Sequence, residues 1–154
     1  MTRMFIFCLL MAAAIYACTS RDNCLTMPSP PDLVNEFEPV NGLIIPAGED
    51  FEVLNTSRNI ADPDNCAGTA TAVDVILRII VEYRIDNFEA FEVIRNSDRS
   101  IGSIEGGEFV ETNFSILFSQ PGQYRITITV DADNLIPERD ESNNVYTLEN
   151  IATK

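Results

Sequence analysis

Apolar and polar residues alternate along most of the chain from residue 33 onward, which is the pattern of strands that bury one face. The longest alternation covers residues 72–85. Its apolar face holds Val73, Val75, Leu77, Ile79, Val81, Tyr83 and Ile85. A strand of that length is expected to bend or bulge partway. Residues 110–118 and 124–130 repeat the pattern with β-branched and aromatic side chains, which favour strands.

Weaker strand patterns lie near residues 33–37, 51–54, 88–94 and 145–148, and turn-forming residues separate the runs. No segment shows a convincing helical period. About seven strands in about 120 residues indicate two antiparallel sheets packed as a sandwich. The predicted fold class is therefore an all-β, Ig-like antiparallel β-sandwich, formed by one domain over residues 33–154.

The first 17 residues differ from the rest of the chain. Arg3 precedes an unbroken apolar run from residue 4 to residue 17. This run is shorter than the roughly 20 residues that a membrane-spanning helix needs, and it has the length of a signal-peptide core. Residues 1–17 are therefore predicted to be a signal peptide.

The end of this apolar run, Ile15-Tyr16-Ala17-Cys18, resembles the lipobox of bacterial lipoproteins. The resemblance implies that the mature chain begins at Cys18 and that Cys18 carries lipid. It also implies a place in the cell envelope, on the outer membrane, facing the periplasm or the cell surface. Polar, proline-containing residues 18–32 would then be a spacer between lipid and domain. The alternative is an ordinary secretory signal that leaves Cys18 as a plain thiol.

Two cysteines remain after the leader and the lipid-bearing position, namely Cys24 in the spacer and Cys66. An even number of cysteines in an exported chain favours a disulfide. Such a bond would tie the spacer to the domain and stabilise it by about 4 kcal/mol on a chain-entropy model. The alternative is two free thiols.

Composition narrows the function classes. The chain has 24 acidic residues, 10 basic residues and a formal net charge of −14, which argues against nucleic-acid partners. It contains no His, so serine–histidine and cysteine–histidine nucleophile chemistry is excluded. Two cysteines without His also cannot complete a zinc tetrahedron. We therefore expect no enzyme activity.

The most specific motif lies between residues 121 and 145. Its elements are Pro121-Gly122, Val130-Asp131, Asn134, Ile136, Glu138, Asp140-Glu141 and Asn143-Asn144. This order resembles the end of CARDB, the cell-adhesion-related domain found in bacteria. Residues 55–57 are identified as a poor counterpart of the family's turn after its second strand. The resemblance implies an Ig-like fold, an extracytoplasmic interaction role and no catalysis.

The same motif concentrates negative charge. Its five carboxylates are Asp131, Asp133, Glu138, Asp140 and Glu141. Calcium binds six to eight oxygen atoms from groups of this kind, so these residues are candidate calcium ligands, although their spacing is not that of an EF-hand. The alternative is a loop whose Asp, Asn and Ser side chains bond their own backbone. No other cofactor is expected.

Three functions remain to be distinguished. The first is a non-catalytic, membrane-anchored adhesion module that presents its domain to a protein or glycan partner. The second is a structural lipoprotein subunit of a cell-envelope complex or filament, for which outward Ile76 and Ile80 are a modest hint. The third is glycoside hydrolysis by a carboxylate pair such as Asp140 and Glu141, which the chain's composition disfavours.

Overall fold

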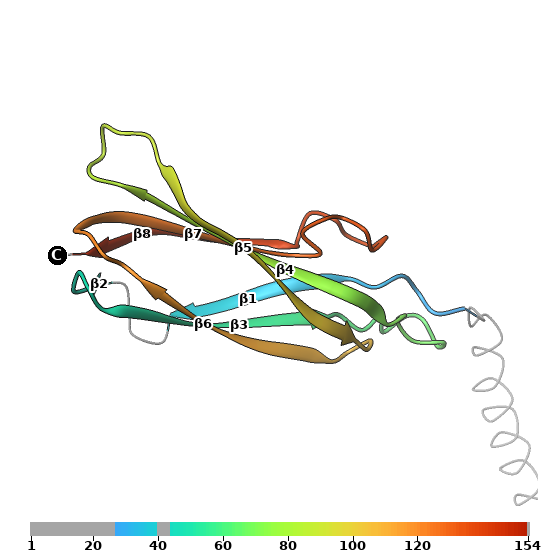
Figure 1. Cartoon of the computed structure of the whole chain (residues 1–154). Helices are drawn as coiled ribbons and strands as arrows, with labels where there is room; N and C mark the ends of the chain where they lie inside the picture. The colour runs from blue at the N-terminus through green and yellow to red at the C-terminus, as the bar shows by residue number, and fades with distance from the viewer. Residues whose placement is uncertain (1–26, 40–43, 154) are drawn as a thin grey trace, which may run out of the picture.

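The computed structural model describes residues 27–39 and 44–153, and these residues form eight strands without a helix (Figure 1). The strands are β1 (Leu33–Pro39), β2 (Ile44–Ile45), β3 (Asp50–Asn59), β4 (Ala72–Arg84), β5 (Glu92–Ile104), β6 (Phe109–Leu117), β7 (Gly122–Val130) and β8 (Val145–Thr153). The predicted signal peptide 1–17, Cys18 and Cys24 lie outside the described residues. No helix within the described part of the chain is long and apolar enough to cross a membrane.

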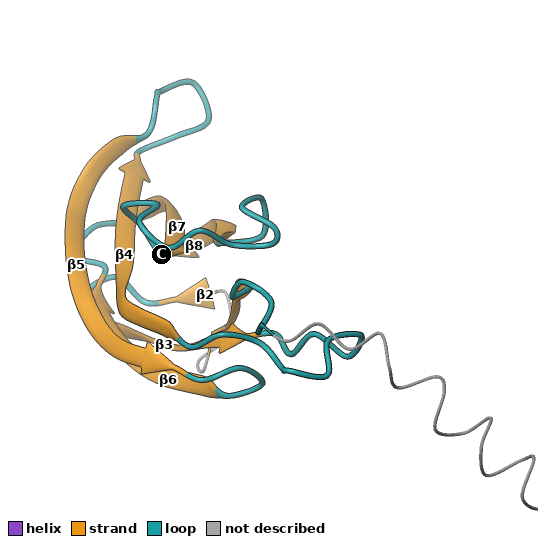
Figure 2. Ribbon diagram, turned by 90° about the vertical axis from the view of Figure 1, so that its right-hand side faces the viewer, coloured by secondary structure: helices purple, strands orange, loops and turns teal. Residues whose placement is uncertain are grey.

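The strands form two sheets that face each other. One sheet has the order β1-β3-β6 and the other has the order β2-β8-β7-β4-β5. All neighbouring strands are antiparallel except the short β2, which runs parallel to β8. Figure 2 shows β5 curving along one edge of the sandwich toward β6. The predicted all-β, Ig-like sandwich is confirmed.

The core lies between the two sheets and is filled by their inward-facing apolar side chains. Its largest fully buried members are Tyr124, Phe51, Phe118, Leu33, Leu77, Ile79, Ile104, Ile126, Ile128, Ile151, Val53 and Val75. Three aromatic rings bridge the sheets at one end, because Phe118 stacks on both Phe51 and Tyr124, with centroid separations of 5.3 Å and 4.1 Å. Contacts of this kind stabilise a core beyond the area that they bury.

Tyr124 also fixes the corner between β6 and β7. Its hydroxyl donates to the backbone carbonyl of Gln120 at 2.9 Å and accepts from the backbone N–H of Gln120 at 3.3 Å. A tyrosine that bonds the backbone a few residues upstream is a hallmark of Ig-like sandwiches. The hydroxyl of Tyr124 therefore satisfies the backbone N–H and C=O of Gln120, while the ring of Tyr124 fills the core.

The expected irregularity in residues 72–85 is a bulge at Asp74. Asp74 has a positive φ of 55°, and the pairing register with β5 shifts between Ala72 and Val75. The extra residue reverses the alternation at the start of β4. Ala72 is consequently buried and Val73 is 57% exposed. Ile85 lies beyond the end of β4 and is 63% exposed, so the prediction that Val73 and Ile85 share the buried face was wrong.

The second predicted strand is longer than its apolar pattern. β3 continues through Asn55, Ser57 and Asn59, which were expected to lie beyond the strand. All three side chains are fully buried, and Asn59 donates to the carbonyls of Ala70 and Ile104. Alternate residues of β3 still face inward in this second half, but they are polar and hydrogen-bonded instead of apolar. The hydrophobic pattern therefore ends before the strand ends.

The fourth strand was misplaced by the sequence pattern. β5 covers Glu92–Ile104 rather than residues 88–94, and residues 85–91 form the turn that connects it to β4. β5 is an edge strand whose residues are mostly exposed. Edge strands of this kind carry polar residues on both faces, so the alternation that marks a half-buried strand is absent.

The described N-terminal residues follow the end of the sandwich that holds the 131–144 loop. Met27 accepts a hydrogen bond from Asn65 at its carbonyl, and Ser29 pairs with the segment around Gly68. Arg139 donates its backbone N–H to the carbonyl of Pro31 at 2.9 Å. The chain therefore enters the domain at this end, whereas the β4–β5 hairpin projects from the other end (Figure 1).

Candidate metal site

The 131–144 loop begins with Asp131, directly after β7. Asp131 is buried and adopts a positive φ of 47°, which Asp tolerates better than most residues. Its carboxylate accepts the backbone N–H groups of Leu135 at 3.1 Å and Ile136 at 2.9 Å. Asn134 supplies a second left-handed residue, with φ of 51°. These features fold the loop back toward the strand that precedes it.

Glu138 ties the loop to β1. One carboxylate oxygen accepts the backbone N–H of Leu33, and the other accepts from Nδ2 of Asn144 at 2.9 Å. Desolvation raises the pKa of Glu138 to about 7, and the negative charges of Glu141 and Asp131 add to the rise, while the two hydrogen bonds oppose it. A carboxyl held in this way binds a proton more readily than an exposed one.

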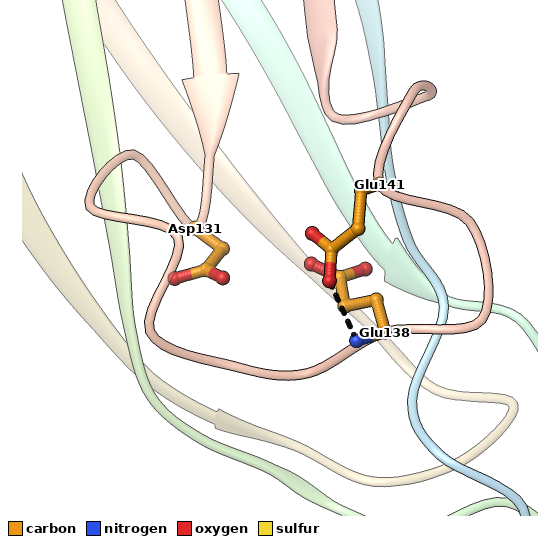
Figure 3. A group of neighbouring side chains, drawn as sticks. All are labelled: Asp131, Glu138 and Glu141. Atoms are coloured by element: carbon orange, nitrogen blue, oxygen red, sulfur yellow. Dashed lines mark hydrogen bonds between the residues drawn. The ribbon is translucent and has the colours of Figure 1, made fainter.

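Glu141 completes a group of three carboxylates. It accepts the backbone N–H of Glu138 at 2.9 Å, and one carboxylate oxygen from each of Asp131, Glu138 and Glu141 lies within 4.8 Å of the others. Figure 3 shows Asp131 below the end of β7, with Glu138 and Glu141 on the opposite arm of the loop. Glu141 is exposed, so the group is open to solvent on one side.

The other two candidate ligands point elsewhere. Asp133 forms an ion pair with Arg78 at 2.9 Å. Asp140 accepts both the backbone N–H and the hydroxyl of Ser142, and these hydrogen bonds lower the pKa of Asp140. The structure therefore brings together three of the five predicted carboxylates.

The two asparagines of the motif line the inner side of the loop. Asn144 is 5% exposed and donates to Glu138, whereas Asn143 donates to a carboxylate oxygen of Asp32 at 2.7 Å. The Oδ1 atoms of both asparagines are buried and accept no hydrogen bond. Buried oxygens without a donor are uncommon in folded proteins, and amide oxygens are suitable calcium ligands.

Asp32 is a member of this site that the sequence pattern did not reveal. It is 9% exposed, accepts from Asn143, and pairs with Arg139 at 2.7 Å. Arg139 also approaches the carboxylate of Asp62 at 3.4 Å. Arg139, the only basic residue in the 131–144 loop, therefore pairs with Asp32 and Asp62. It does not pair with the three-carboxylate group.

The arrangement has two chemical consequences. Each carboxylate of the group already accepts at least one backbone or amide donor. The loop is therefore internally hydrogen-bonded, as expected for the alternative to a calcium site. Three carboxylates whose oxygens lie within 4.8 Å of one another also form a donor set that suits a hard divalent cation. The geometry is compatible with both.

The described domain resembles known proteins in sequence and in fold. The CARDB family model matches residues 67–148, which is more than half of the chain, and no curated protein sequence matches it significantly. The solution structure of the CARDB domain of the PF1109 protein from Pyrococcus furiosus is 24% identical, with a TM-score of 0.61 over 82% of this chain and 97% of that chain. The crystal structure of the same domain, in complex with di-metal ions, is 23% identical with a TM-score of 0.61, over 83% and 97%.

A β-glucosidase from Listeria innocua matches much more weakly. It is 14% identical with a TM-score of 0.50, and the match covers 80% of this chain but only 16% of the enzyme. That likeness concerns the fold of one segment of a much larger protein. The family match, the sandwich topology and the motif at residues 121–145 agree with one another, and the chain therefore belongs to the CARDB family.

Proposed function

We propose that this protein is a non-catalytic adhesion module, held to a bacterial envelope membrane by lipid on Cys18, that presents its Ig-like domain to a partner. The observation that carries the proposal is a CARDB domain following an apolar leader that ends at Cys18. Lipid on one cysteine, with several acyl chains, is enough for stable anchoring. Membership of a family linked to adhesion supports binding rather than catalysis.

The path of the N-terminal segment indicates which end of the domain would face the membrane. Residues 27–32 are bonded to the end of the sandwich that holds the 131–144 loop. A lipid attached at Cys18 would therefore hold that end toward the membrane. The opposite end, with the β4–β5 hairpin, would face away from it and be free to meet a partner.

The anchor is tested by replacing Cys18 with serine in the full chain. The wild-type protein is expected in the membrane fraction and to require detergent for release, whereas Cys18→Ser is expected in the soluble fraction or as an uncleaved precursor. A Met27→Ala variant, which alters an exposed spacer residue, should fractionate like the wild type. Release of the wild type without detergent, or processing of Cys18→Ser at the same site as the wild type, would overturn the anchor.

We also propose the Cys24–Cys66 disulfide. Cys66 follows Asn65, whose side chain donates to the carbonyl of Met27 at 3.1 Å. Met27 is three residues from Cys24, so the spacer passes close to Cys66. Peptide mass spectrometry without reduction should find a cross-linked peptide that contains both cysteines, and recovery of two alkylated thiols would contradict the bond.

Calcium binding by the 131–144 loop is a second proposed property. Its support is the group of Asp131, Glu138 and Glu141, together with the unpartnered Oδ1 of buried Asn144. The PF1109 domain in complex with di-metal ions is a relative for which metal binding has been observed.

Thermal unfolding in excess calcium and in chelator tests this property. Calcium at about 100 times its dissociation constant would add about 2.7 kcal/mol of stability. Glu141→Gln should remove most of that gain, whereas Asp133→Asn should retain it because Asp133 pairs with Arg78 outside the group. Coincident wild-type curves with and without calcium would exclude the site.

A further inference from the structure

The β4–β5 hairpin ends in an exposed aromatic residue. β7 pairs with β4 only as far as Arg84, so residues 85–91 extend past the neighbouring strand and project from the sandwich (Figures 1 and 2). Phe88 lies in this turn and is 97% exposed. Burial of an aromatic ring is favourable, so the position of Phe88 at a projecting tip needs an explanation.

Hydrogen bonds within the hairpin and to β7 fix the turn that carries Phe88. A carboxylate oxygen of Asp86 accepts the backbone N–H of Phe88 at 2.8 Å. Arg84 donates to Asn87 at 3.1 Å and to Gln123 of β7 at 2.8 Å. The turn is therefore ordered before any partner arrives, and a preordered contact lowers the entropy cost of association.

A second aromatic residue braces the base of the hairpin. The guanidinium carbons of Arg84 and Arg125 lie 4.4 Å and 4.5 Å from the ring centre of Phe91. Arg125 is itself fixed by two hydrogen bonds of 2.6 Å to Glu82. Arg125 is neutralised by Glu82, whereas Arg84 contacts only neutral groups and keeps its positive charge at the base of the hairpin. Residues 85–93 themselves carry three carboxylates and no basic residue.

The hairpin tip combines exposed apolar residues with exposed acidic ones. Ile85 and Val93 flank the turn in the sequence and are 63% and 60% exposed. The exposed acidic residues of the same segment are Asp86, Glu89 and Glu92. Aromatic anchors are typical of binding hot spots, and a segment with one sign of charge selects partners of the opposite charge.

We propose that residues 85–93 dock into a partner protein that offers an apolar pocket for Phe88 with lysine or arginine side chains around it. The inference rests on the proposed anchoring, which turns this end of the domain away from the membrane. The three exposed carboxylates of the segment also disfavour insertion into the anionic lipids of a membrane surface. The hairpin is accordingly the surface by which this adhesion module recognises its partner.

Site-specific photo-crosslinking in native host cells tests the proposal with the full chain. The photoreactive analogue p-benzoylphenylalanine, which keeps the aromatic ring, replaces Phe88 in one variant. In the control it replaces Leu135, which is 77% exposed in the 131–144 loop at the opposite end. Membrane fractionation of the same cells reports separately on the anchor.

The expected result is a discrete protein adduct from position 88 that is absent from position 135, with lysine or arginine flanking the crosslinked site of the partner. Changing Asp86 to Asn and both Glu89 and Glu92 to Gln should lower the adduct yield about tenfold, because the negative charge of the segment steers association. Asn keeps the oxygen that holds the N–H of Phe88.

Several results would overturn the proposal. These are no adduct at position 88, equal adducts at both positions, an adduct with lipid or glycan, or a crosslinked site without basic residues. If they arise while the protein stays in the membrane fraction, the hairpin assignment fails and the anchor stands. A protein found in the soluble fraction would instead contradict the anchor, whatever the crosslinking shows.

Discussion

Ionisation of Glu138 should make the domain less stable as pH rises from about 5 to about 7. Desolvation raises the pKa of this carboxyl from 4.5 to about 7 in the folded protein. The folded state therefore binds more protons than the unfolded state between those pH values, and the free energy of unfolding must fall as pH increases across that window. Glu138→Gln removes the titrating group and should remove this slope.

The magnitude follows from the shift and from the exposure of the side chain. A rise from 4.5 to about 7 corresponds to roughly 3 kcal/mol at about 1.4 kcal/mol per pKa unit. Glu138 is only half-buried, so solvent screening reduces the effect, and we expect about 1 to 1.5 kcal/mol. The lowered pKa values of Glu82, Asp98 and Asp140 place their titrations below this window.

Urea unfolding followed by far-ultraviolet circular dichroism at several pH values measures the effect in calcium-free buffer. Wild type should lose about 1 to 1.5 kcal/mol between pH 5 and pH 7.5, while Glu138→Gln should stay level apart from a constant offset. A Glu36→Gln variant on exposed β1 surface should keep the wild-type slope. A flat wild-type profile, or an unchanged slope in Glu138→Gln, would refute the desolvated state of Glu138.

The remaining predictions concern stability and are measured as changes in the urea midpoint. Tyr124→Phe should cost about 1 to 2 kcal/mol because the carbonyl of Gln120 loses its donor; no change would deny the corner bond its role. Gly106→Ala should cost about 1 to 3 kcal/mol, since a Cβ there would lie 2.6 Å from the backbone oxygen of Thr69; wild-type stability would contradict that close approach. Asp74→Val should cost about 1 to 2 kcal/mol more than Asp74→Gly at the positive-φ bulge, and equal stabilities would argue against the left-handed backbone.

The sequence predicted the sandwich because its central strands bury apolar residues at every second position. It predicted the wrong face for Val73, since one bulged residue at Asp74 reverses the alternation. It also ended the second strand too early, because Asn55 and Ser57 face inward with polar side chains. Hydrophobic periodicity reports burial of apolar groups, so it misses strands whose buried positions are hydrogen-bonded.

Only those residues of the candidate site that lie close together in the sequence could be predicted. Asp131, Glu138 and Glu141 share one loop, and their proximity follows from the motif that holds them. Asp32 comes from a segment about a hundred residues earlier and reaches the loop through Asn143 and Arg139. Composition alone could not separate carboxylates of the group from those bonded elsewhere, because partners such as Arg78 for Asp133 are set by tertiary contacts.

Mass spectrometry of the amino-terminal peptide, from protein extracted from native membranes, tests the central claim of an anchored CARDB module most directly. The account predicts a chain that begins at Cys18, with diacylglycerol on the sulfur and an acyl group on the new amine. An unmodified terminus, or a mature chain that begins at any other residue, would contradict the lipid anchor and the orientation of the domain that depends on it.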